Sequence, residues 1–363
     1  MPTAPLTLLV ITSLLAALTV LPLSRNPAWW VRAGEFPRLQ LSVLLLVTFL
    51  LTLLVGPITP VVWGLLGVQL VCLAYQAWWI VPYSRLFPVE VKASGRDDPD
   101  RRLRIITANV LTTNRNAAGL IALVESHRPD ILVTLESDAW WQEQLAPLER
   151  EYRHTMRCPL DNFYGMHVYS RLRFSECATE FLVESEVPSM HALVTLRSGE
   201  DVRIHFLHPA PPSPTENNES SERDAELIIV ARSVAEGDGP IVVTGDLNDV
   251  AWSATTRLFR KISGLLDPRV GRGMFNTFHA GHWYLRWPLD HIFHSRHFTL
   301  HHVERLRPFG SDHFALLTEL ALEPERGASQ AGLDADAEDA SRAREIASAE
   351  SVTSDDVPTP GKA

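Results

Sequence analysis

Three long apolar segments open the chain. They run from Leu6 to Leu23, from Leu39 to Val55 and from Ile58 to Val81, and no charged residue lies inside any of them. Each segment is about 17–24 residues long, which is the length that a helix needs to cross the hydrocarbon core of a bilayer. The pattern therefore predicts a three-helix transmembrane anchor over residues 1–82 of a multi-pass protein of the cell membrane.

The flanks of these segments refine this prediction. The first segment lacks the basic stretch and the small-x-small cleavage site of a signal peptide, so we expect it to remain as a membrane helix. Gly56-Pro57 is expected to form a tight hairpin between the second and third helices. The pairs Trp29-Trp30 and Trp78-Trp79 then fall on the same side of the bilayer, where aromatic side chains gather at the interface.

The pattern changes after residue 82, where short apolar runs alternate with amphipathic stretches. Residues 83–100, broken by Pro88 and Pro99, are predicted to be a juxtamembrane linker, and residues 101–323 a catalytic domain. This domain is expected to be of the α/β class, with mixed sheets covered by helices on their outer faces. The predicted strands are 103–110, 130–136, 166–170, 192–196, 202–207, 240–245, 289–294, 299–303 and 314–320, and the predicted helices are 117–127, 140–150, 221–235 and 255–262. Residues 324–363 are rich in Ala, Ser, Asp and Glu, and we expect a disordered acidic tail.

The distribution of charge indicates which side of the membrane the domain faces, and it disfavours nucleic-acid binding. Arginines occur in the first loop and directly after the third apolar segment, whereas the other side of the anchor has no Lys or Arg, so the charges favour a cytoplasmic catalytic domain. Residues 83–323 carry 26 Lys and Arg against 33 Asp and Glu. Nucleic-acid binding needs clustered basic side chains on phosphates, so this acidic balance makes a nucleic acid the less favoured partner.

Polar side chains stand at the ends of the predicted strands and carry the candidate chemistry. They are Asn109, Glu136, His208, Asp246 with Asn248, Asp290, and Asp312 with His313 after Ser311. Each one alone is explained by a turn or a helix start, because Asp and Asn favour such positions for local hydrogen bonding. If the strands converge at one rim, however, the set forms a single polar cluster.

The residue types in this cluster suit phosphoryl chemistry. Glu136 is a hard oxygen ligand of the kind that Mg²⁺ prefers, with Mn²⁺ as the alternative ion, and Asn109 and Asp312 could add contacts. Asp246 could orient or deprotonate a water, and Asn248 could donate to a phosphate oxygen. A protonated His313 or His208 would offset negative charge on the phosphate, and Asp290 would raise the pKa of His313. The residues leave open whether Asp246 or His313 is the base.

Taken in this order, the set resembles the endonuclease/exonuclease/phosphatase superfamily, which has the DNase I-like fold, over about residues 101–322. The three-helix anchor is similar to that of a membrane-bound bacterial subgroup. The resemblance implies a four-layer α/β sandwich and metal-dependent hydrolysis of phosphate esters. It implies metal binding by Glu136, with Asn109 and Asp312 near it. It also implies water activation by Asp246, phosphate contact by Asn248 and His208, and a pair of His313 with Asp290. The residue before the metal-binding glutamate is often Gln in this superfamily and is Leu135 here.

The substrate is a separate question, because one fold serves many substrates. The anchor, the acidic domain and the aromatic stretch 278–287 favour a phosphate ester or pyrophosphate on a lipid-linked substrate beside the bilayer. A membrane-tethered nuclease is the alternative, and a non-enzymatic membrane scaffold is a third possibility that the complete polar set disfavours. The sequence does not predict an oligomeric state.

Overall fold

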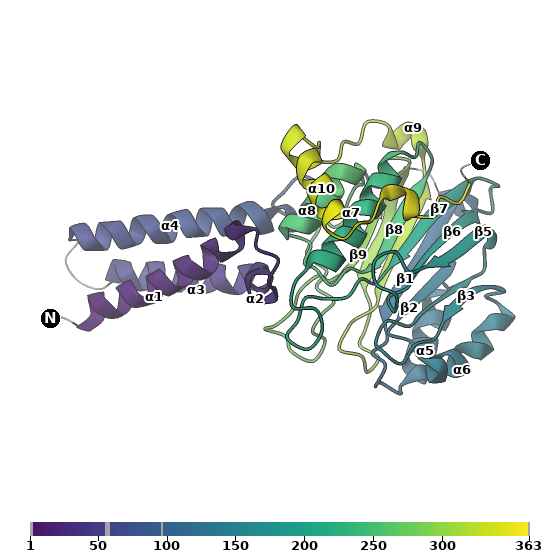
Figure 1. The fold of residues 1–363 in the computed structure, drawn as a ribbon, viewed down its shortest axis with the longest axis horizontal. Helices are drawn as coiled ribbons and strands as arrows, with labels where there is room; N and C mark the ends of the chain where they lie inside the picture. Colours follow the sequence, from purple (N-terminus) through teal and green to yellow (C-terminus); the bar gives the residue numbers. More distant parts are fainter. Residues whose placement is uncertain (1–2, 55–58, 96, 362–363) are drawn as a thin grey trace.

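The computed structural model describes residues 3–54, 59–95 and 97–361. Three apolar helices, α1 (Thr3–Val20), α3 (Arg38–Leu54) and α4 (Pro60–Ile80), extend from one end of a globular α/β domain (Figure 1). Spans Pro5–Ser24 and Pro60–Tyr83 are long and apolar enough to cross a membrane. Helix α3 qualifies only together with the short stretch Trp29–Glu35, from which it is bent by 66°. The described residues thus hold two candidate spans, or three if the bent pair is one span, and the predicted Gly56-Pro57 hairpin lies outside them.

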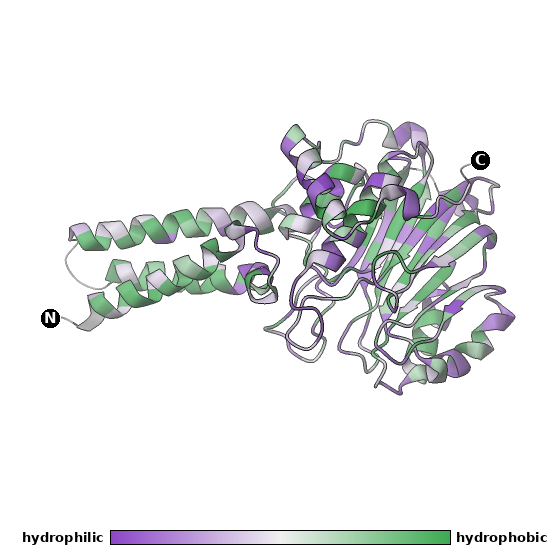
Figure 2. Ribbon diagram, in the orientation of Figure 1, coloured by the Kyte–Doolittle hydropathy of each residue, from purple (hydrophilic) through white to green (hydrophobic). Residues whose placement is uncertain are grey.

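The three helices pack with polar groups inside and apolar groups outside. The side chain of Gln69 is buried and donates to Thr12 (2.7 Å) and Thr52 (3.1 Å), so α4 is tied to both α1 and α3. Leu15 and Leu45 fill the small interior of the bundle, while most other leucines of these helices are exposed. The three helices are apolar along most of their length (Figure 2). This arrangement is typical of helices surrounded by lipid, where interhelical hydrogen bonds replace a hydrophobic core.

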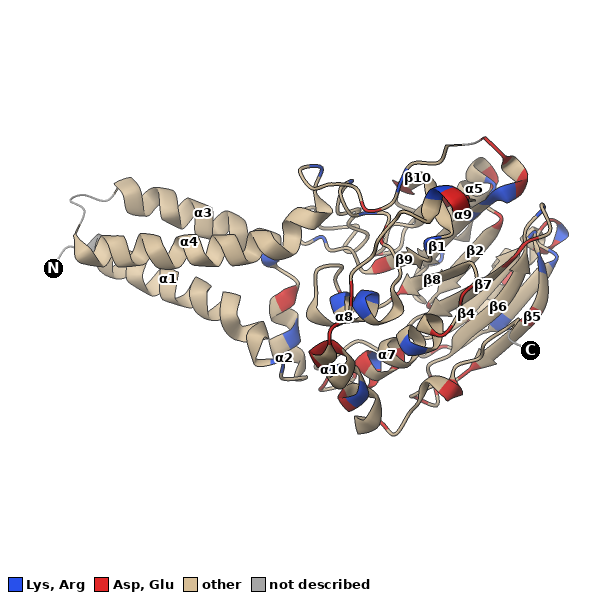
Figure 3. Ribbon diagram, turned by 90° about the horizontal axis from the view of Figure 1, so that it is seen from above, with Lys and Arg blue, Asp and Glu red and all other residues tan. Residues whose placement is uncertain are grey.

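Two short elements turn the chain between α1 and α3. Helix η1 (Leu21–Ser24) ends α1, and α2 (Trp29–Arg32) and η2 (Ala33–Glu35) lie against the domain. After α4, the turn η3 (Val81–Tyr83) leads into the globular part, which η4 (Pro99–Arg101) opens. Charged side chains are confined to this end of the anchor and to the domain (Figure 3).

Two mixed sheets form the centre of the domain. The six-stranded sheet has the order β10 (Phe298–Arg305), β11 (Leu316–Leu322), β1 (Arg102–Asn109), β2 (Ile131–Leu135), β4 (Met166–Ser170) and β3 (His154–Cys158). The five-stranded sheet has the order β5 (Arg173–Glu180), β6 (Ser189–Thr195), β7 (Asp201–Leu207), β8 (Ile241–Asp246) and β9 (Asp290–His294). The inner faces share one apolar core, in which Val133 and Val168 of the first sheet meet Ile204 and Val242 of the second.

Helices cover the two outer faces. Helix α5 (Ala117–His127), α6 (Ala139–Leu145) and η5 (Ala146–Arg150) pack on the six-stranded sheet, where Leu120 and Trp141 share a buried cluster with Leu132. Helix α7 (Ser221–Ala235) and α8 (Ala254–Ser263) cover the five-stranded sheet, where Val230 and Phe259 meet Val243 and Phe293. The result is a four-layer α/β sandwich, which confirms the predicted fold class (Figure 1).

The segment predicted as a juxtamembrane linker lies against the domain. Val91 is completely buried in the central core. Glu90 accepts hydrogen bonds from Arg260 (2.5 Å) and from the backbone of Asp267 (3.0 Å). Backbone bonds also join residues 92 and 94 to Leu300 of β10. The connection between anchor and domain is therefore fixed along most of its length.

The acidic tail, for which the sequence predicts disorder, contains ordered elements. They are α9 (Pro324–Gly327), α10 (Ala337–Ala349) and η6 (Ser354–Asp356). Helix α10 buries Ala343 and Ala347 against α7 and α8. Its first turn is held by a capping box between Asp336 and Asp339. The prediction failed because a contact made by alanines leaves little trace in hydropathy.

Candidate active site

The predicted site residues on the parallel strands lie at one rim of the sandwich. Strand β1 runs parallel to β2, and β7 runs parallel to β8, so the carboxyl ends of each pair point the same way. Asn109 and Asp246 are the last residues of β1 and β8, while Glu136 and His208 directly follow β2 and β7. A hydrogen bond between Thr107 and Thr244 (2.8 Å) joins the two sheets just behind this rim.

The remaining residues reach the same rim from antiparallel neighbours. Asp290 opens β9 directly opposite Asp246. Asp312 and His313 precede β11, which is antiparallel to β1. Ser311 fixes this turn, because its hydroxyl donates to the carbonyl of Asn109 (2.8 Å) and accepts from the backbone of His313 (3.0 Å). The structure therefore brings all of the sequence-predicted candidates together.

The backbone at this rim is unusual at three positions. Gly245 has φ 153°, and a Cβ there would lie 1.8 Å from the carbonyl oxygen of Leu207, so only glycine fits between β8 and β7. Glu136 and Asn248 have φ values of 58° and 51°. A left-handed non-glycine residue costs on the order of 1–3 kcal/mol and is often retained where it directs a functional side chain.

A row of Asp290, His313 and Asp246 crosses the rim, joined by one hydrogen bond and one ion pair. Nδ1 of His313 lies 2.8 Å from Oδ2 of Asp290, and its Nε2 lies 3.5 Å from Oδ2 of Asp246. Burial by itself would lower the pKa of His313, but the two carboxylates outweigh it and raise that pKa to about 10. His313 is thus a cation at neutral pH. Burial also raises the pKa of Asp246, an effect that the charge of His313 opposes.

Glu136 lies beside this row and has an unused acceptor. Its Oε1 accepts from the amide of Asn109 (2.7 Å), and the same amide reaches Asp246 (3.2 Å). Its Oε2 is buried without a hydrogen-bond partner, and burial raises the pKa of Glu136 to about 7. A buried carboxylate oxygen without a donor fits a divalent cation, which would supply the missing positive charge.

A second group of potential ligands is Asp246, Asp290 and His313, whose ligand atoms lie within 4.8 Å of one another. However, both ring nitrogens of His313 face carboxylates, and its raised pKa keeps a proton on each of them. An imidazolium has no lone pair for a metal ion. Of these groups, Glu136 is the one with a free buried oxygen that could hold a metal ion, whereas His313 is placed to offer positive charge.

His208 and Asn248 form the part of the candidate site that lies next to the five-stranded sheet. Burial lowers the pKa of His208 to about 4, so it is a neutral hydrogen-bonding group at pH 7 rather than a second cation. Its Nδ1 is buried without a partner, and its ring packs against Tyr164 at 5.5 Å. The amide of Asn248 donates to the carbonyl of Pro209 (3.0 Å), which leaves its second hydrogen for another acceptor.

Two further residues, Thr277 and Phe278, support the candidates from behind. The hydroxyl of Thr277 accepts hydrogen bonds from the backbone of Leu289 and of Asp290, and so holds the start of β9. Phe278 packs against the ring of His313 at 4.9 Å and stacks on Trp287. The aromatic stretch 278–287 stands out in the sequence, but only the fold places Phe278 on the histidine, and no local pattern indicates Thr277.

The loop that follows Asp246 is attached to the anchor. The carboxylate of Glu35, in η2, accepts from the backbone of Ala254 (3.0 Å), and its carbonyl accepts from the indole of Trp252 (2.9 Å). The hydroxyl of Tyr83, the last residue of η3, donates to the carbonyl of Ala251 (2.6 Å). Residues 247–254 are therefore bonded to the anchor at one end and to the site at the other.

Comparison with known families identifies this arrangement. Residues 106–313 match the model of the Endonuclease/Exonuclease/phosphatase family. The chain belongs to this family. Members of the endonuclease/exonuclease/phosphatase family are hydrolases of phosphoester bonds and generally use a divalent metal. The matched segment begins in β1 and ends at His313, so it contains all eight candidate residues.

Solved structures of the endonuclease/exonuclease/phosphatase family share the fold of this domain. TDP2 from D. rerio, complexed with a single-strand DNA product, is 18% identical with a TM-score of 0.51, over 60% of this chain and 98% of its own. A family protein from Bacteroides vulgatus is 17% identical with a TM-score of 0.51, over 61% and 99%. The human Nocturnin catalytic domain, with bound sulfate, is 16% identical with a TM-score of 0.50, over 62% and 96%. No functionally curated protein matches the chain.

Proposed function

We propose that this protein is a membrane-anchored, Mg²⁺-dependent phosphoesterase that hydrolyses a phosphate ester or pyrophosphate on a lipid-linked substrate. The observation that carries the proposal is a continuous set of contacts from the apolar helix α3 to His313. The family membership supports the reaction class, and these contacts support the substrate class.

The contacts run through the aromatic loop, which we define as residues 279–287. The side chain of Gln40 in α3 donates to the carbonyl of Tyr284 (2.9 Å), and Phe36 meets Trp287 edge to face. Trp287 in turn stacks on Phe278, the residue against His313. At the tip of the loop, Trp283 is 80% exposed and Tyr284 is 54% exposed. Aromatic side chains in such a position suit the bilayer interface or the apolar part of a lipid substrate.

The site residues have distinct roles in the proposed reaction. Asp246 orients the attacking water and accepts its proton, since its contact with His313 (3.5 Å) is looser than that of Asp290 (2.8 Å). His313, positioned by Asp290, offsets the negative charge that develops on the phosphate oxygens. His208 and the free amide hydrogen of Asn248 supply neutral hydrogen bonds to the same oxygens.

Glu136 is the proposed ligand of Mg²⁺, with Asn109 and Asp312 beside it. When bound, the ion polarises a phosphate oxygen and stabilises the leaving oxygen. Asn109 already orients the carboxylate of Glu136 through the 2.7 Å hydrogen bond. Asp312 is held by its carbonyl, which accepts from the backbone of Ala280 in the aromatic loop (2.6 Å).

Purified full-length protein in neutral detergent tests the proposal against a panel of lipid phosphates, lipid pyrophosphates and supercoiled plasmid, each with Mg²⁺ or with EDTA. We expect Mg²⁺-dependent release of phosphate from a lipid and none from the variant Asp246→Asn. The exposed variant Asp161→Asn is the matched control. Plasmid nicking without any lipid turnover would overturn the lipid assignment.

Hydrolysis of nucleic acid is the second candidate, and it has one specific observation in its favour. The structural relative TDP2 is described in complex with a single-strand DNA product. That likeness is one of fold at 18% identity, and the acidic balance of residues 83–323 weighs against a nucleic-acid partner. The plasmid arm of the same experiment decides between the two candidates.

A further inference from the structure

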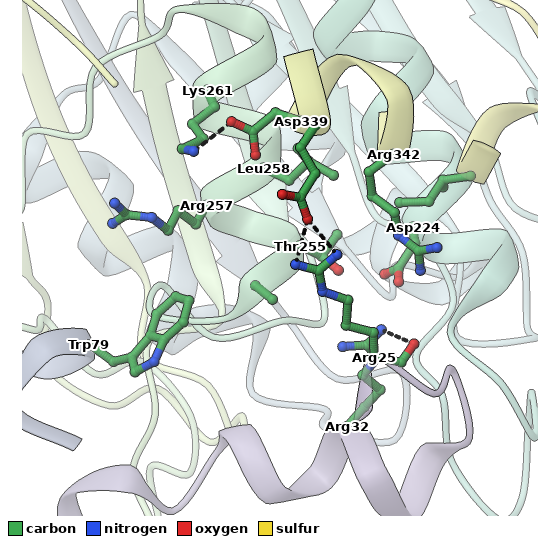
Figure 4. Close-up of a pocket in the computed structure, with 13 residues that line it drawn as sticks. Arg25, Arg32, Trp79, Asp224, Thr255, Arg257, Leu258, Lys261, Asp339 and Arg342 are labelled. Atoms are coloured by element: carbon green, nitrogen blue, oxygen red, sulfur yellow. Dashed lines mark hydrogen bonds and ion pairs between the residues drawn. The ribbon is translucent and has the colours of Figure 1, made fainter. Parts of the chain in front are cut away.

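A cavity of about 180 Å³ lies at the junction of the anchor and the domain (Figure 4). It is lined by Arg25 after η1, by Arg32 of α2, by Arg257 and Lys261 of α8, and by Arg342 of α10. Three carboxylates also line it, namely Asp224, Glu338 and Asp339. The cavity is distinct from the catalytic rim and has more cationic than anionic side chains.

Several donors in this cavity have no acceptor. Nε and Nη1 of Arg32 are buried without a hydrogen-bond partner, and the nearest carboxylate oxygen to Nη1, on Glu35, lies 3.8 Å away. The indole nitrogen of Trp79 is buried and unpartnered as well. None of the ion pairs among the described residues includes Arg257. Buried N–H groups without acceptors favour a ligand that carries anionic oxygens.

The cavity lies where the membrane spans end. Arg25 directly follows η1, Arg32 is the last residue of α2, and Trp79 lies in the last turn of α4. This level corresponds to the headgroup layer of a bilayer that surrounds the three helices. The anion that is most abundant in this layer is the phosphate of a phospholipid.

A second, largely apolar cavity adjoins the first. It has about 410 Å³ and is lined by Ala74, Ala77 and Trp78 of α4 and by Val81 of η3, among others. Arg257 lines both cavities. A cationic cavity and an apolar one that share an arginine match the two ends of a phospholipid.

We propose that this junction is a binding site for an anionic phospholipid, with the headgroup at Arg32, Arg257 and Lys261 and an acyl chain along α4. Helix α10 competes for the cations, because Glu338 pairs with Arg25 (3.1 Å) and Asp339 pairs with Lys261 (2.5 Å). The site is separate from the proposed catalytic function, but it rests on the proposed placement of the anchor in a bilayer.

Native mass spectrometry of the full-length protein in neutral detergent tests this site. The protein is titrated with phosphatidylglycerol, with phosphatidylcholine of the same acyl chains, or with glycerol phosphate. We expect preference for phosphatidylglycerol, and a loss of about tenfold in its affinity in the double variant Arg257→Gln/Lys261→Gln, with phosphatidylcholine unaffected. The exposed Arg153→Gln, directly before β3, is the control and should bind like the wild type.

A variant that is expected to bind phosphatidylglycerol more tightly distinguishes the loss of a binding site from a loss of folding. Glu338→Gln removes the carboxylate that pairs with Arg25, so it should raise the affinity for phosphatidylglycerol by about two- to fivefold. Equal binding of the two lipids, or unchanged binding in the double variant, would overturn the site. Binding of glycerol phosphate as tight as that of the lipid would overturn the role of the apolar cavity. The membrane placement is tested separately by reconstitution into phosphatidylglycerol vesicles. Failure of the wild type to insert into these vesicles would overturn that placement.

Discussion

The substitution Asp290→Asn probes the electrostatics of the site without relying on the substrate. Asp290 and His313 are both buried, and 2.8 Å separates Oδ2 of the first from Nδ1 of the second. Asparagine keeps the shape and can still accept a hydrogen bond, but it removes the charge that holds His313 protonated. We expect a loss of stability that depends on pH.

The magnitude follows from the pKa of His313. A rise from 6.5 to about 10 corresponds to on the order of 5 kcal/mol of preferential stabilisation of the imidazolium, at about 1.4 kcal/mol per pH unit. Asp246 shares this effect with Asp290, so the substitution should cost about 2–3 kcal/mol at neutral pH. Because the folded-state pKa lies above that of the unfolded chain, the stabilisation is fully present below pH 6.5 and is lost as the pH rises through about 10.

Thermal unfolding of the full-length protein in detergent, followed between pH 6 and pH 11, measures this effect. The Tm of Asp290→Asn should lie about 4–12 °C below that of the wild type at pH 7, given about 2–4 °C per kcal/mol for a domain of this size. The difference should shrink to about 3 °C or less above pH 10. The exposed Asp161→Asn should match the wild type throughout. A Tm difference that stayed constant from pH 6 to pH 11 would refute the charge-based reasoning and leave only a packing effect.

Three further substitutions test other parts of the structure. Glu136→Gln removes one ligand charge, so it should weaken Mg²⁺ binding by at least about tenfold in isothermal calorimetry, while its Tm stays within about 3 °C of the wild type. Unchanged affinity for Mg²⁺ would place the ion elsewhere. Gly245→Ala should prevent folding or cost more than about 3 kcal/mol, since its Cβ would meet the carbonyl of Leu207 at 1.8 Å, and a soluble variant with wild-type Tm would contradict the tight β7–β8 approach. Trp252→Phe should cost about 1 kcal/mol and lower Tm by about 2–4 °C, because the indole no longer donates to the carbonyl of Glu35; no change would argue that this contact adds nothing to stability.

The strands that carry the site could be predicted because their residues follow a simple physical pattern. Strands β1, β2 and β8 are buried on both faces, so each is a short apolar run that ends abruptly in a polar residue. Strand β5 was missed because it is mostly exposed at the edge of its sheet and has no apolar alternation. Helix α10 was missed because it docks through alanines. Hydropathy reports burial of large side chains, and these two elements bury few of them.

The candidate site, like the fold, could be predicted from the sequence only in part. The residue types and their positions at strand ends were sufficient to predict which side chains meet. The raised pKa of His313 could be predicted from Asp290, but the protonation of His208 could not, because burial, which no local pattern contains, lowers its pKa. The support from Thr277 depends on backbone contacts across more than ten residues of chain, which no local pattern contains.

The fixed connection between anchor and domain has a consequence for how the protein meets its substrate. A domain on a flexible tether sweeps out a volume and collides with molecules at many heights above the bilayer. Here Tyr83, Glu90 and Val91 lock the connection, and Glu35 and Gln40 add contacts from the other helices. With the apolar helices placed in a bilayer, as proposed, the catalytic rim is held at one height and one tilt. On the proposed function, a phosphate is then accessible according to its depth relative to the bilayer surface, and lengthening the connection would broaden the range of depths that the site can sample.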